Sequence, residues 1–214
     1  MKSTFSITDL QSWDRFTRAN FINTLSGFKS LSLIGTVNTA GISNLAAFSN
    51  IVHLGADPAL IGFVNRPLEA APHTLSNIQE TGYYTVNLIT EAMYKQAHQT
   101  SAKYPEGVSE FEMTGLTPEF KEGCIAPFVA ASPVQYVLKL EKVIPIELNG
   151  TFFVIGSLQS VYVTAGIQEE DGFLDLAKAG ILTSLGTSGY YKICLLYTSP
   201  SPRDYAASRM PSSA

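Results

Sequence analysis

The most constraining feature of the sequence is an alternating segment at residues 134–148, which ends at Asn149-Gly150. Its apolar side chains recur at every second position: Val134, Tyr136, Leu138 and Leu140 fall on one face, and Gln135, Lys139 and Glu141 mostly on the other. A period of two predicts a strand with one buried face. Asn-Gly is a strong hairpin signal because both residues tolerate positive φ. With residues 151–164 as the returning strand, a long antiparallel hairpin is expected.

The rest of the chain predicts more strands than long helices. We expect helices over residues 8–26, 73–81 and 91–100, strands over 30–37, 59–65 and 83–89, and an extended surface excursion over 101–124. Strands and helices do not alternate regularly, which excludes a doubly wound parallel sheet. Long antiparallel strands joined by tight turns favour a closed or nearly closed barrel, because closure removes exposed sheet edges. The sequence therefore predicts a mainly β protein with flanking helices.

Length and composition set the domain organisation. The chain has 214 residues, of which 45% are hydrophobic and 15% charged, which suits one globular core. Near Cys194 the composition shifts to Ser, Pro and Arg without periodicity. We therefore expect one domain over residues 1–192 and a non-native or disordered tail over 193–214.

Charge and residue spacing exclude several classes of function. A net charge of −4 argues against binding to nucleic-acid phosphates. No apolar run approaches the roughly 20 residues that span a bilayer, and no secretion signal is evident, so we expect no membrane association and a cytoplasmic location. Cys124 and Cys194 form no CxxC pair, and His53, His73 and His98 lack metal-ligand spacing, so no metal site is expected.

Polar residues at strand ends form the candidate binding site. Residues 43–50 (SNLAAFSN) combine small, hydroxyl and amide side chains, which suit the wall around a flat heteroaromatic ring. Arg66, with His73 and Thr74 at the start of a predicted helix, suits a phosphate. Each piece has a plain alternative, because an Asn/Ser-rich segment can be a simple turn and Thr74 can be a helix cap. Phosphate-loop, dinucleotide-loop, zincin and hydrolase-elbow motifs are absent.

The order of these pieces carries a resemblance. SNLAAFSN, a strand ending in NRP, and HTLSNIQETGYYTVNLI together resemble the flavin reductase-like family of FMN-binding split barrels. The likeness continues through AHQTSAKYPEGVSEFEMTGL, APFV and PIELNGTFFVIGSLQSVYV to residues 188–192. The resemblance implies an FMN-binding split β-barrel, a Greek-key antiparallel barrel, that forms a homodimer with the flavin near the subunit interface. It also implies NAD(P)H as a transient co-substrate.

The resemblance further implies a set of cofactor contacts: Asn44, Leu45, Ala46, Phe48, Ser49, Asn50, Arg66, His73, Thr74, Ser101 and Lys103. According to the resemblance, Arg66 and Thr74 hold the phosphate, with His73 beside them. Ser101 and Lys103 either belong to a loop that approaches the flavin or are ordinary solvated residues. His98 is expected to be structural or at the interface. No catalytic residue is assigned, because hydride passes from nicotinamide to flavin and the cofactor carries the chemistry.

One departure from the family keeps alternatives open. Many of its reductases have a Gly-Asp-His element where this chain reads Asn149-Gly150-Thr151, without the histidine that meets the nicotinamide. The leading hypothesis is an NAD(P)H-dependent flavin reductase. The first alternative is a non-enzymatic FMN electron carrier of the flavoredoxin type, served by a redox protein partner, and the second is a binding or scaffold role on the same barrel.

Overall fold

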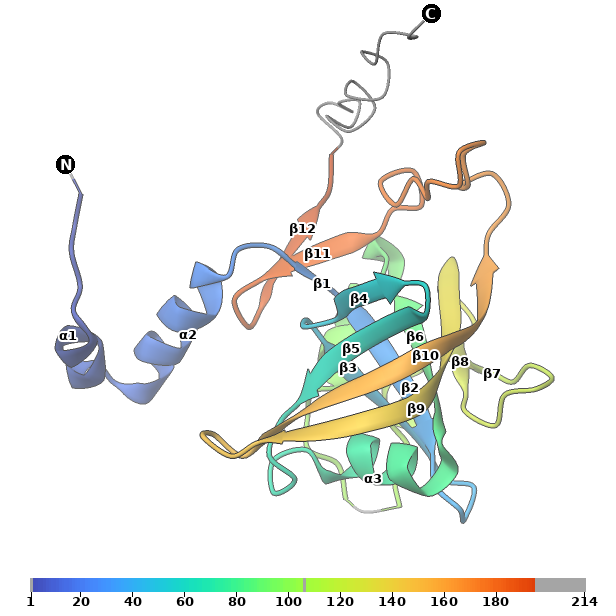
Figure 1. The fold of residues 1–214 in the computed structure, drawn as a ribbon, viewed down its shortest axis with the longest axis horizontal. Helices are drawn as coiled ribbons and strands as arrows, with labels where there is room; N and C mark the ends of the chain where they lie inside the picture. The colour runs from blue at the N-terminus through green and yellow to red at the C-terminus, as the bar shows by residue number, and fades with distance from the viewer. Residues whose placement is uncertain (1, 106, 195–214) are drawn as a thin grey trace, which may run out of the picture.

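The fold is organised around one antiparallel sheet (Figure 1). The computed structural model describes residues 2–105 and 107–194, so residues 195–214 of the expected tail lie outside the described residues. The seven strands lie in the order β3-β2-β6-β9-β10-β5-β4. Their bounds are β2 (Ser32–Val37), β3 (Ser43–Phe48), β4 (Val52–Ala56), β5 (Ala59–Asn65), β6 (Tyr83–Leu88), β9 (Val134–Ile146) and β10 (Thr151–Val163). The prediction of a mainly β, antiparallel fold is confirmed.

The predicted hairpin is the longest pairing in this sheet. Strands β9 and β10 pair from Val134↔Val163 to Ile146↔Thr151, with two irregularities that bend the ribbon. The expected polar outer face is partly wrong at Gln135, which is buried. Its Nε2 donates to the Val129 carbonyl at 2.7 Å, because a small sheet of β7 (Pro118–Glu119) and β8 (Phe128–Val129) covers that face.

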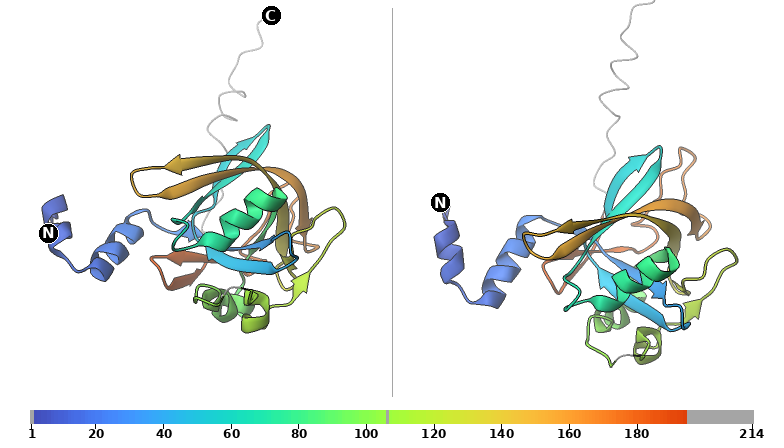
Figure 2. Two further views of the ribbon diagram at one scale, coloured as in Figure 1. Left: turned by 90° about the horizontal axis from the view of Figure 1, so that it is seen from below. Right: turned by 60° about the horizontal axis from the view of Figure 1, so that its bottom comes forward.

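Apolar residues on the two faces of β2 belong to the two larger of the three core clusters in the described residues. Leu33 belongs to one cluster and its neighbour Ile34 to the other, as expected where successive side chains of a strand alternate. Helix α3 (Pro72–Thr81) covers the second cluster with Leu75 and Ile78 (Figure 2), and it ends at a left-handed Gly82, as predicted.

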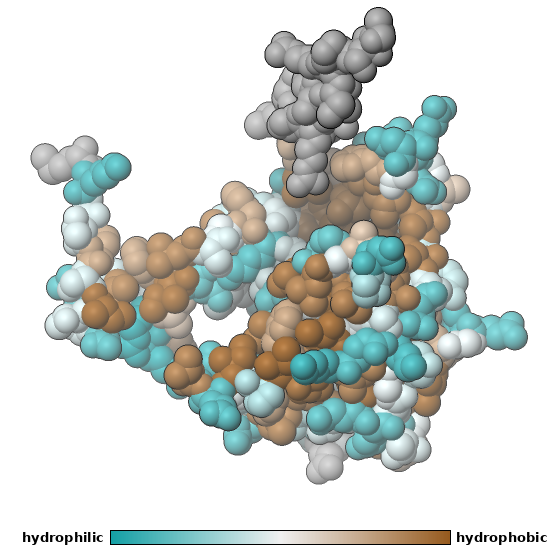
Figure 3. Space-filling view, in the orientation of Figure 1, coloured by the Kyte–Doolittle hydropathy of each residue, from teal (hydrophilic) through white to brown (hydrophobic). Residues whose placement is uncertain are grey.

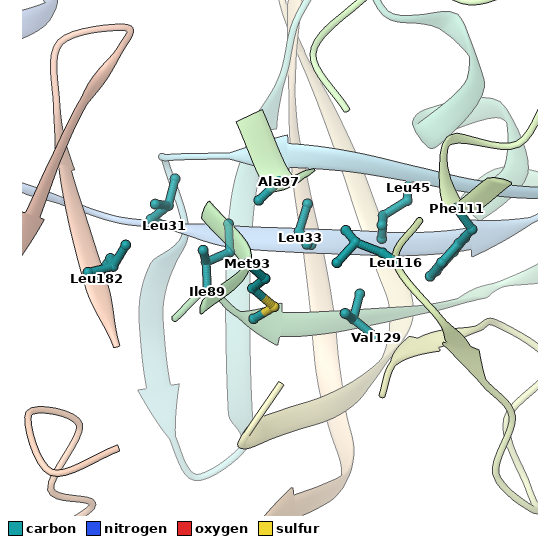
Figure 4. Packing of buried hydrophobic residues seen from close by; sticks show 10 residues of the cluster. All are labelled: Leu31, Leu33, Leu45, Ile89, Met93, Ala97, Phe111, Leu116, Val129 and Leu182. Carbon is teal, nitrogen blue, oxygen red and sulfur yellow. The ribbon is translucent and has the colours of Figure 1, made fainter. Parts of the chain in front are cut away.

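The first cluster is covered by short helices (Figure 4). These are η1 (Glu91–Met93), α4 (Tyr94–Gln99) and α5 (Glu110–Thr114). Phe111 and Leu116 contribute buried side chains to this cluster. The segment 101–124, expected to be a surface excursion, therefore supplies part of the core, because Phe111 and Leu116 belong to the same buried cluster as Leu33 of β2.

A second, three-stranded sheet was not predicted. It consists of β1 (Lys29–Ser30), β11 (Leu182–Leu185) and β12 (Gly189–Lys192), in the order β1-β11-β12. Thr183 anchors it by donating from its hydroxyl to the Lys29 carbonyl at 2.6 Å. The hairpin of β11 and β12, residues 182–192, brings the late part of the chain back to the beginning of the barrel.

The N-terminal segment forms an arm that stands apart from the barrel (Figures 1 and 2). The single helix predicted over residues 8–26 is wrong, because the arm contains α1 (Ile7–Ser12) and α2 (Arg15–Leu25). Asp14 separates them: its carboxylate accepts from the N–H groups of Phe16 and Thr17 and starts a new helix. Neither helix buries a residue, and apolar side chains gather on the surface of the arm (Figure 3).

A single amide side chain joins two separated parts of the large sheet. Strands β3 and β4 are its two edges, so the ladder does not close into a full barrel. Just after β3, Asn50 Nδ2 donates to the Val64 carbonyl of β5 at 2.8 Å, and Val64 N–H donates back to Asn50 Oδ1 at 3.4 Å. We call this junction the seam.

No helix in the described part of the chain is long and apolar enough to cross a membrane.

Candidate functional site

A cavity of about 440 Å³ opens beside the seam. Its volume falls within the roughly 300–1,000 Å³ of small-molecule pockets. Its wall is formed by the end of β3, the loop between β5 and α3, the first turn of α3, the end of α4 and the hairpin 182–192, and α2 contributes Asn23. We call it the seam cavity.

The seam cavity brings together most of the predicted site residues. Seven of the eleven line it: Ala46, Phe48, Ser49, Asn50, Arg66, Thr74 and Ser101. The ring-binding candidates of residues 43–50 and the phosphate-binding candidates Arg66 and Thr74 therefore share one cavity. The two groups come from separate elements, and the sheet order supplies their proximity.

Local packing fixes the shape of this wall. Phe48 lies edge-to-face on the buried Phe63, with ring centroids 4.9 Å apart, which anchors the end of β3 in the core. Below the loop that carries Arg66, the buried Asn65 Nδ2 donates to the carbonyls of Arg66 and Ala71, at 2.8 and 3.3 Å. The Arg66 side chain is exposed above this pinned loop and is free to reach a ligand.

A buried polar network holds Thr74. Asn44 Nδ2 donates to both Thr74 Oγ1 and Thr36 Oγ1 at 3.2 Å, and Asn77 Nδ2 donates to Thr36 Oγ1 at 3.1 Å. The N-cap of α3 is Ala71, not Thr74, and it has no side-chain capping bond. Within the described part of the chain, the Thr74 hydroxyl donates no hydrogen bond. Since Asn44 uses an acceptor position on Thr74, its proton remains available to the cavity.

The other four predicted residues lie elsewhere. Asn44 and His73 line a neighbouring polar cavity of about 320 Å³. Leu45 points into the core, and its N–H donates to Glu110 Oε2 at 2.9 Å, so its side chain is not available to a ligand in the seam cavity. Lys103 is exposed and lines none of the cavities described.

Sequence reasoning missed the wall that the hairpin 182–192 provides. Ser184 and Tyr190 line the seam cavity, together with the turn between their strands and with His98 of α4. Tyr190 Oη lies 2.6 Å from His98 Nδ1. Burial raises the pKa of the Tyr190 phenol. The signal available was the stretch TSLGTSGY, where hydroxyl residues surround two glycines.

The seam cavity favours an anionic ligand. Among the described residues that line it, none is Asp or Glu, and Arg66 supplies a guanidinium, although the whole chain carries a net charge of −4. A guanidinium beside hydroxyl donors is a strong hydrogen-bonding set for a phosphate. Over residues 2–105 and 107–194, no group of three or more His, Cys, Asp or Glu side chains could hold a metal ion.

The fold and the seam cavity together define a split-barrel protein with a ligand-sized cavity beside its open seam. Residues 26–186 match the flavin reductase like domain, and the chain belongs to this family. A Shewanella frigidimarina NCIMB 400 protein, assigned as a flavin reductase with a split barrel domain, superposes with a TM-score of 0.90 at 44% identity, covering 93% of this chain and 99% of its own.

Two further relatives extend the comparison. An uncharacterised protein from Halalkalibacterium halodurans is 31% identical over 170 residues, which cover 77% of this chain and 81% of the relative. Flavoredoxin of Desulfovibrio vulgaris (Miyazaki F) has a TM-score of 0.72 at 24% identity, covering 83% of this chain and 93% of its own, and shares the fold. The predicted family is thus confirmed.

Proposed function

We propose that this protein binds FMN in the seam cavity and acts as an NAD(P)H-dependent flavin reductase. One observation carries the proposal: the small and polar residues at the end of β3 share an acid-free cavity with Arg66 and Thr74. FMN consists of a flat ring, a hydroxylated chain and a phosphate, and the wall of the seam cavity suits all three.

Each part of the cavity has a role in this proposal. Arg66 and the Thr74 hydroxyl hold the phosphate, since Arg66 supplies a positive charge and the Thr74 O–H supplies a hydrogen-bond donor. The small side chains of Ala46 and Ala47 leave room for the ring to approach the backbone. When bound, FMN supplies the site that accepts hydride from a nicotinamide, and the protein positions the two rings.

The visible spectrum of the FMN-reconstituted protein tests the proposal. We expect stoichiometric bound flavin that bleaches anaerobically with NADH or NADPH. Thr74→Val and Arg66→Ala should each raise the FMN dissociation constant by about 10- to 150-fold, as loss of a hydrogen bond to a charged group predicts. Lys142→Ala, at an exposed position of β9 outside the lining of the seam cavity, is the control and should leave binding unchanged. Failure to bind FMN refutes the site, whereas bound flavin that neither nicotinamide reduces refutes the reductase activity alone.

The alternative is an FMN electron carrier that a redox protein partner serves. It is favoured by the hairpin turn at residues 149–151, which lacks histidine. There, Asn149 Oδ1 accepts from the Thr151 N–H at 3.1 Å and from its hydroxyl at 2.7 Å, so the polar groups of the turn bond to each other. This alternative predicts tight, stoichiometric FMN with negligible NAD(P)H oxidation.

We also propose that the protein is a homodimer in which the N-terminal arm contacts the second copy. Helix α2 has 11 residues, fewer than an isolated helix needs for stability in water, and buries none of them. Phe16 is 82% exposed. Sedimentation velocity should show a dimer that Phe16→Asp weakens. Leu148→Asp, at a similarly exposed position on the hairpin tip, is the matched control, and a monomeric wild type refutes the proposal.

The domain and its location complete the proposal. We place one domain over residues 1–192 in the cytoplasm, where thiols such as that of the buried Cys124 stay reduced. Limited proteolysis should remove residues 193–214 without loss of FMN. Release of FMN on this cleavage would instead assign the tail to the domain, and recovery of the protein outside the cytoplasm on cell fractionation would contradict the location.

A further inference from the structure

We propose that the cavity of about 320 Å³ next to the seam cavity binds a primary ammonium group, and that this binding strengthens the binding of a phosphorylated ligand in the seam cavity. We call it the polar cavity. The link between the two cavities rests on the proposed function, because FMN is the phosphorylated ligand considered there. The ammonium site itself is independent of flavin.

The polar cavity differs in charge from its neighbour. It is lined by the turn between β2 and β3, the start of β3, helix α3 and the described residues that lead into α5. Among the described residues of this lining, Glu110 is the only acid and none is Lys or Arg, and the other titratable side chains are those of His73 and Tyr104. The seam cavity has Arg66 and no acid. The two cavities therefore suit ligands of opposite charge.

Two buried amide side chains in the wall offer oxygen atoms to a ligand. Asn44 and Asn77 line the polar cavity and are only 8% and 7% exposed. Each donates from Nδ2 to Thr36 Oγ1, at 3.2 and 3.1 Å. In the described part of the chain, neither Oδ1 atom accepts a hydrogen bond. Since buried polar groups are normally hydrogen-bonded, a donor within the cavity would satisfy both oxygens.

Glu110 supplies a third acceptor in a fixed position. Its Oε2 accepts from the Leu45 N–H at 2.9 Å. Over residues 2–105 and 107–194, Oε1 has no hydrogen bond and the carboxylate forms no ion pair. The next residue, Phe111, belongs with Leu45 to the first core cluster (Figure 4), so the start of α5 is held against β3. The carboxylate therefore has one oxygen left for a ligand.

This set of acceptors selects a primary ammonium group. Such a group carries a positive charge and three N–H donors and has no acceptor, which matches one carboxylate and two amide oxygens. The aromatic ring of Tyr104 in the same lining is a further group that attracts cations. The cavity also has room for an alkyl chain. A quaternary ammonium lacks the N–H donors and an alcohol lacks the charge, so both should bind more weakly.

The side chain of Asn44 connects the two cavities. It lines the polar cavity, and its Nδ2 donates to Oγ1 of Thr74, which lines the seam cavity. An ammonium group on one side of Asn44 and a phosphate on the other would attract each other, and partly buried charges are screened less than exposed ones. By linkage, each ligand must then raise the affinity for the other by the same factor.

The competing explanation is that the polar cavity holds only water and that Glu110 merely fastens α5 to β3. Glu110→Gln separates the two, because the glutamine oxygen can still accept from the Leu45 N–H while the negative charge is lost. Glu112→Gln is the matched control. It makes the same chemical change in the same helix, at an exposed residue that does not line the polar cavity.

The first experiment is an NMR titration of the full chain without flavin at pH 8, where an imidazole is ordinarily neutral. The compounds are n-butylammonium, tetramethylammonium and butan-1-ol. We expect saturable shifts at residues of the polar cavity with n-butylammonium alone. Glu110→Gln should raise its dissociation constant by about 10- to 150-fold, as loss of a hydrogen bond to a charged group predicts, and Glu112→Gln should not change it.

Three results would overturn the ammonium site. The first is no saturable binding of n-butylammonium, which is the result expected of a cavity that holds only water. The second is equal binding of all three compounds, and the third is equal affinity in Glu110→Gln and wild type.

The second experiment measures the FMN dissociation constant with and without saturating n-butylammonium, at an ionic strength held constant with tetramethylammonium chloride. It should fall by about fivefold or more, whereas that of riboflavin, which has the same ring without the phosphate, should not change. No change for FMN, or an equal change for both flavins, overturns the link between the cavities. Failure to bind FMN refutes the proposed function and the link together, whereas the titration without flavin still decides the ammonium site.

Discussion

Substitution of Asn44 by Ala tests how the buried network prepares the Thr74 hydroxyl. The Asn44 amide donates at 3.2 Å to both Thr74 and Thr36, and its loss removes two neutral hydrogen bonds. At about 0.5–1.5 kcal/mol each, Asn44→Ala should lower the free energy of unfolding by about 1–3 kcal/mol. Asn77→Ala, which removes only the 3.1 Å bond to Thr36, should cost about half as much.

The two variants should differ in ligand binding. Without Asn44, the Thr74 hydroxyl is no longer oriented and can adopt three staggered positions, so its bond to a phosphate should weaken by about threefold. The effect of Thr74→Val sets the upper limit, because that variant removes the hydroxyl donor entirely. Asn77→Ala should leave the FMN dissociation constant unchanged, since Asn77 does not contact Thr74.

Two assays separate these effects. Urea unfolding gives the change in stability, and quenching of flavin fluorescence gives the FMN dissociation constant at low temperature, where all variants remain folded. Equal weakening of FMN binding by Asn44→Ala and Asn77→Ala would show that the network acts only through overall stability. Weaker binding in Asn44→Ala than in Thr74→Val would also refute the reasoning, because orientation cannot matter more than the group itself.

Three further predictions concern stability. Tyr84 is fully buried and its hydroxyl has no partner among the described residues. Tyr84→Phe should therefore leave the free energy of unfolding unchanged or raise it by about 1–3 kcal/mol, as urea unfolding can measure. A loss of stability above about 1 kcal/mol would contradict this reasoning. Burial raises the pKa of Tyr84 and Tyr136 above their usual value of about 10, so the unfolded chain loses these protons first and stability should fall as pH rises beyond about 10. Ultraviolet titration should then show two tyrosines that ionise only on unfolding; early ionisation of all of them would refute it. Asp14→Ala should cost about 1 kcal/mol of α2 stability, visible as faster amide exchange in its first turn but not in α3.

The sequence predicted the elements whose signals are local. The alternation before Asn149-Gly150 yielded the β9–β10 hairpin, and Gly82 correctly marked the end of α3. The break at Asp14 was missed, because a capping side chain inside a helical pattern resembles any other polar residue until its bonds are known. Strands β11 and β12 were missed because each has only four residues, too few to establish a period.

The sequence predicted the part of the candidate site formed by residues 46–50, Arg66 and Thr74, and did not predict the part formed by the hairpin 182–192 and His98. Residues 46–50 lie together in sequence, and Arg66 and Thr74 follow them in an order that the family resemblance made meaningful. Tyr190 and His98 are 92 residues apart, and only the return of the C-terminal hairpin to the barrel brings them into contact. Leu45 was assigned to the site because the family resemblance implies contacts from residues 44–50, whereas its side chain lies in the core.

Because Asn50 both joins the two parts of the sheet and lines the seam cavity, the stability of the barrel depends on whether a ligand is bound there. Neighbouring strands of a closed barrel share a full ladder of backbone hydrogen bonds. Here the Asn50 amide donates one bond to Val64 at 2.8 Å and accepts one from it at 3.4 Å. A molecule lodged against that amide would brace the weakest part of the wall. Thermal unfolding should therefore begin by separation of β3 from β5 in the empty protein, and occupancy should delay this opening more than it delays fraying of the arm.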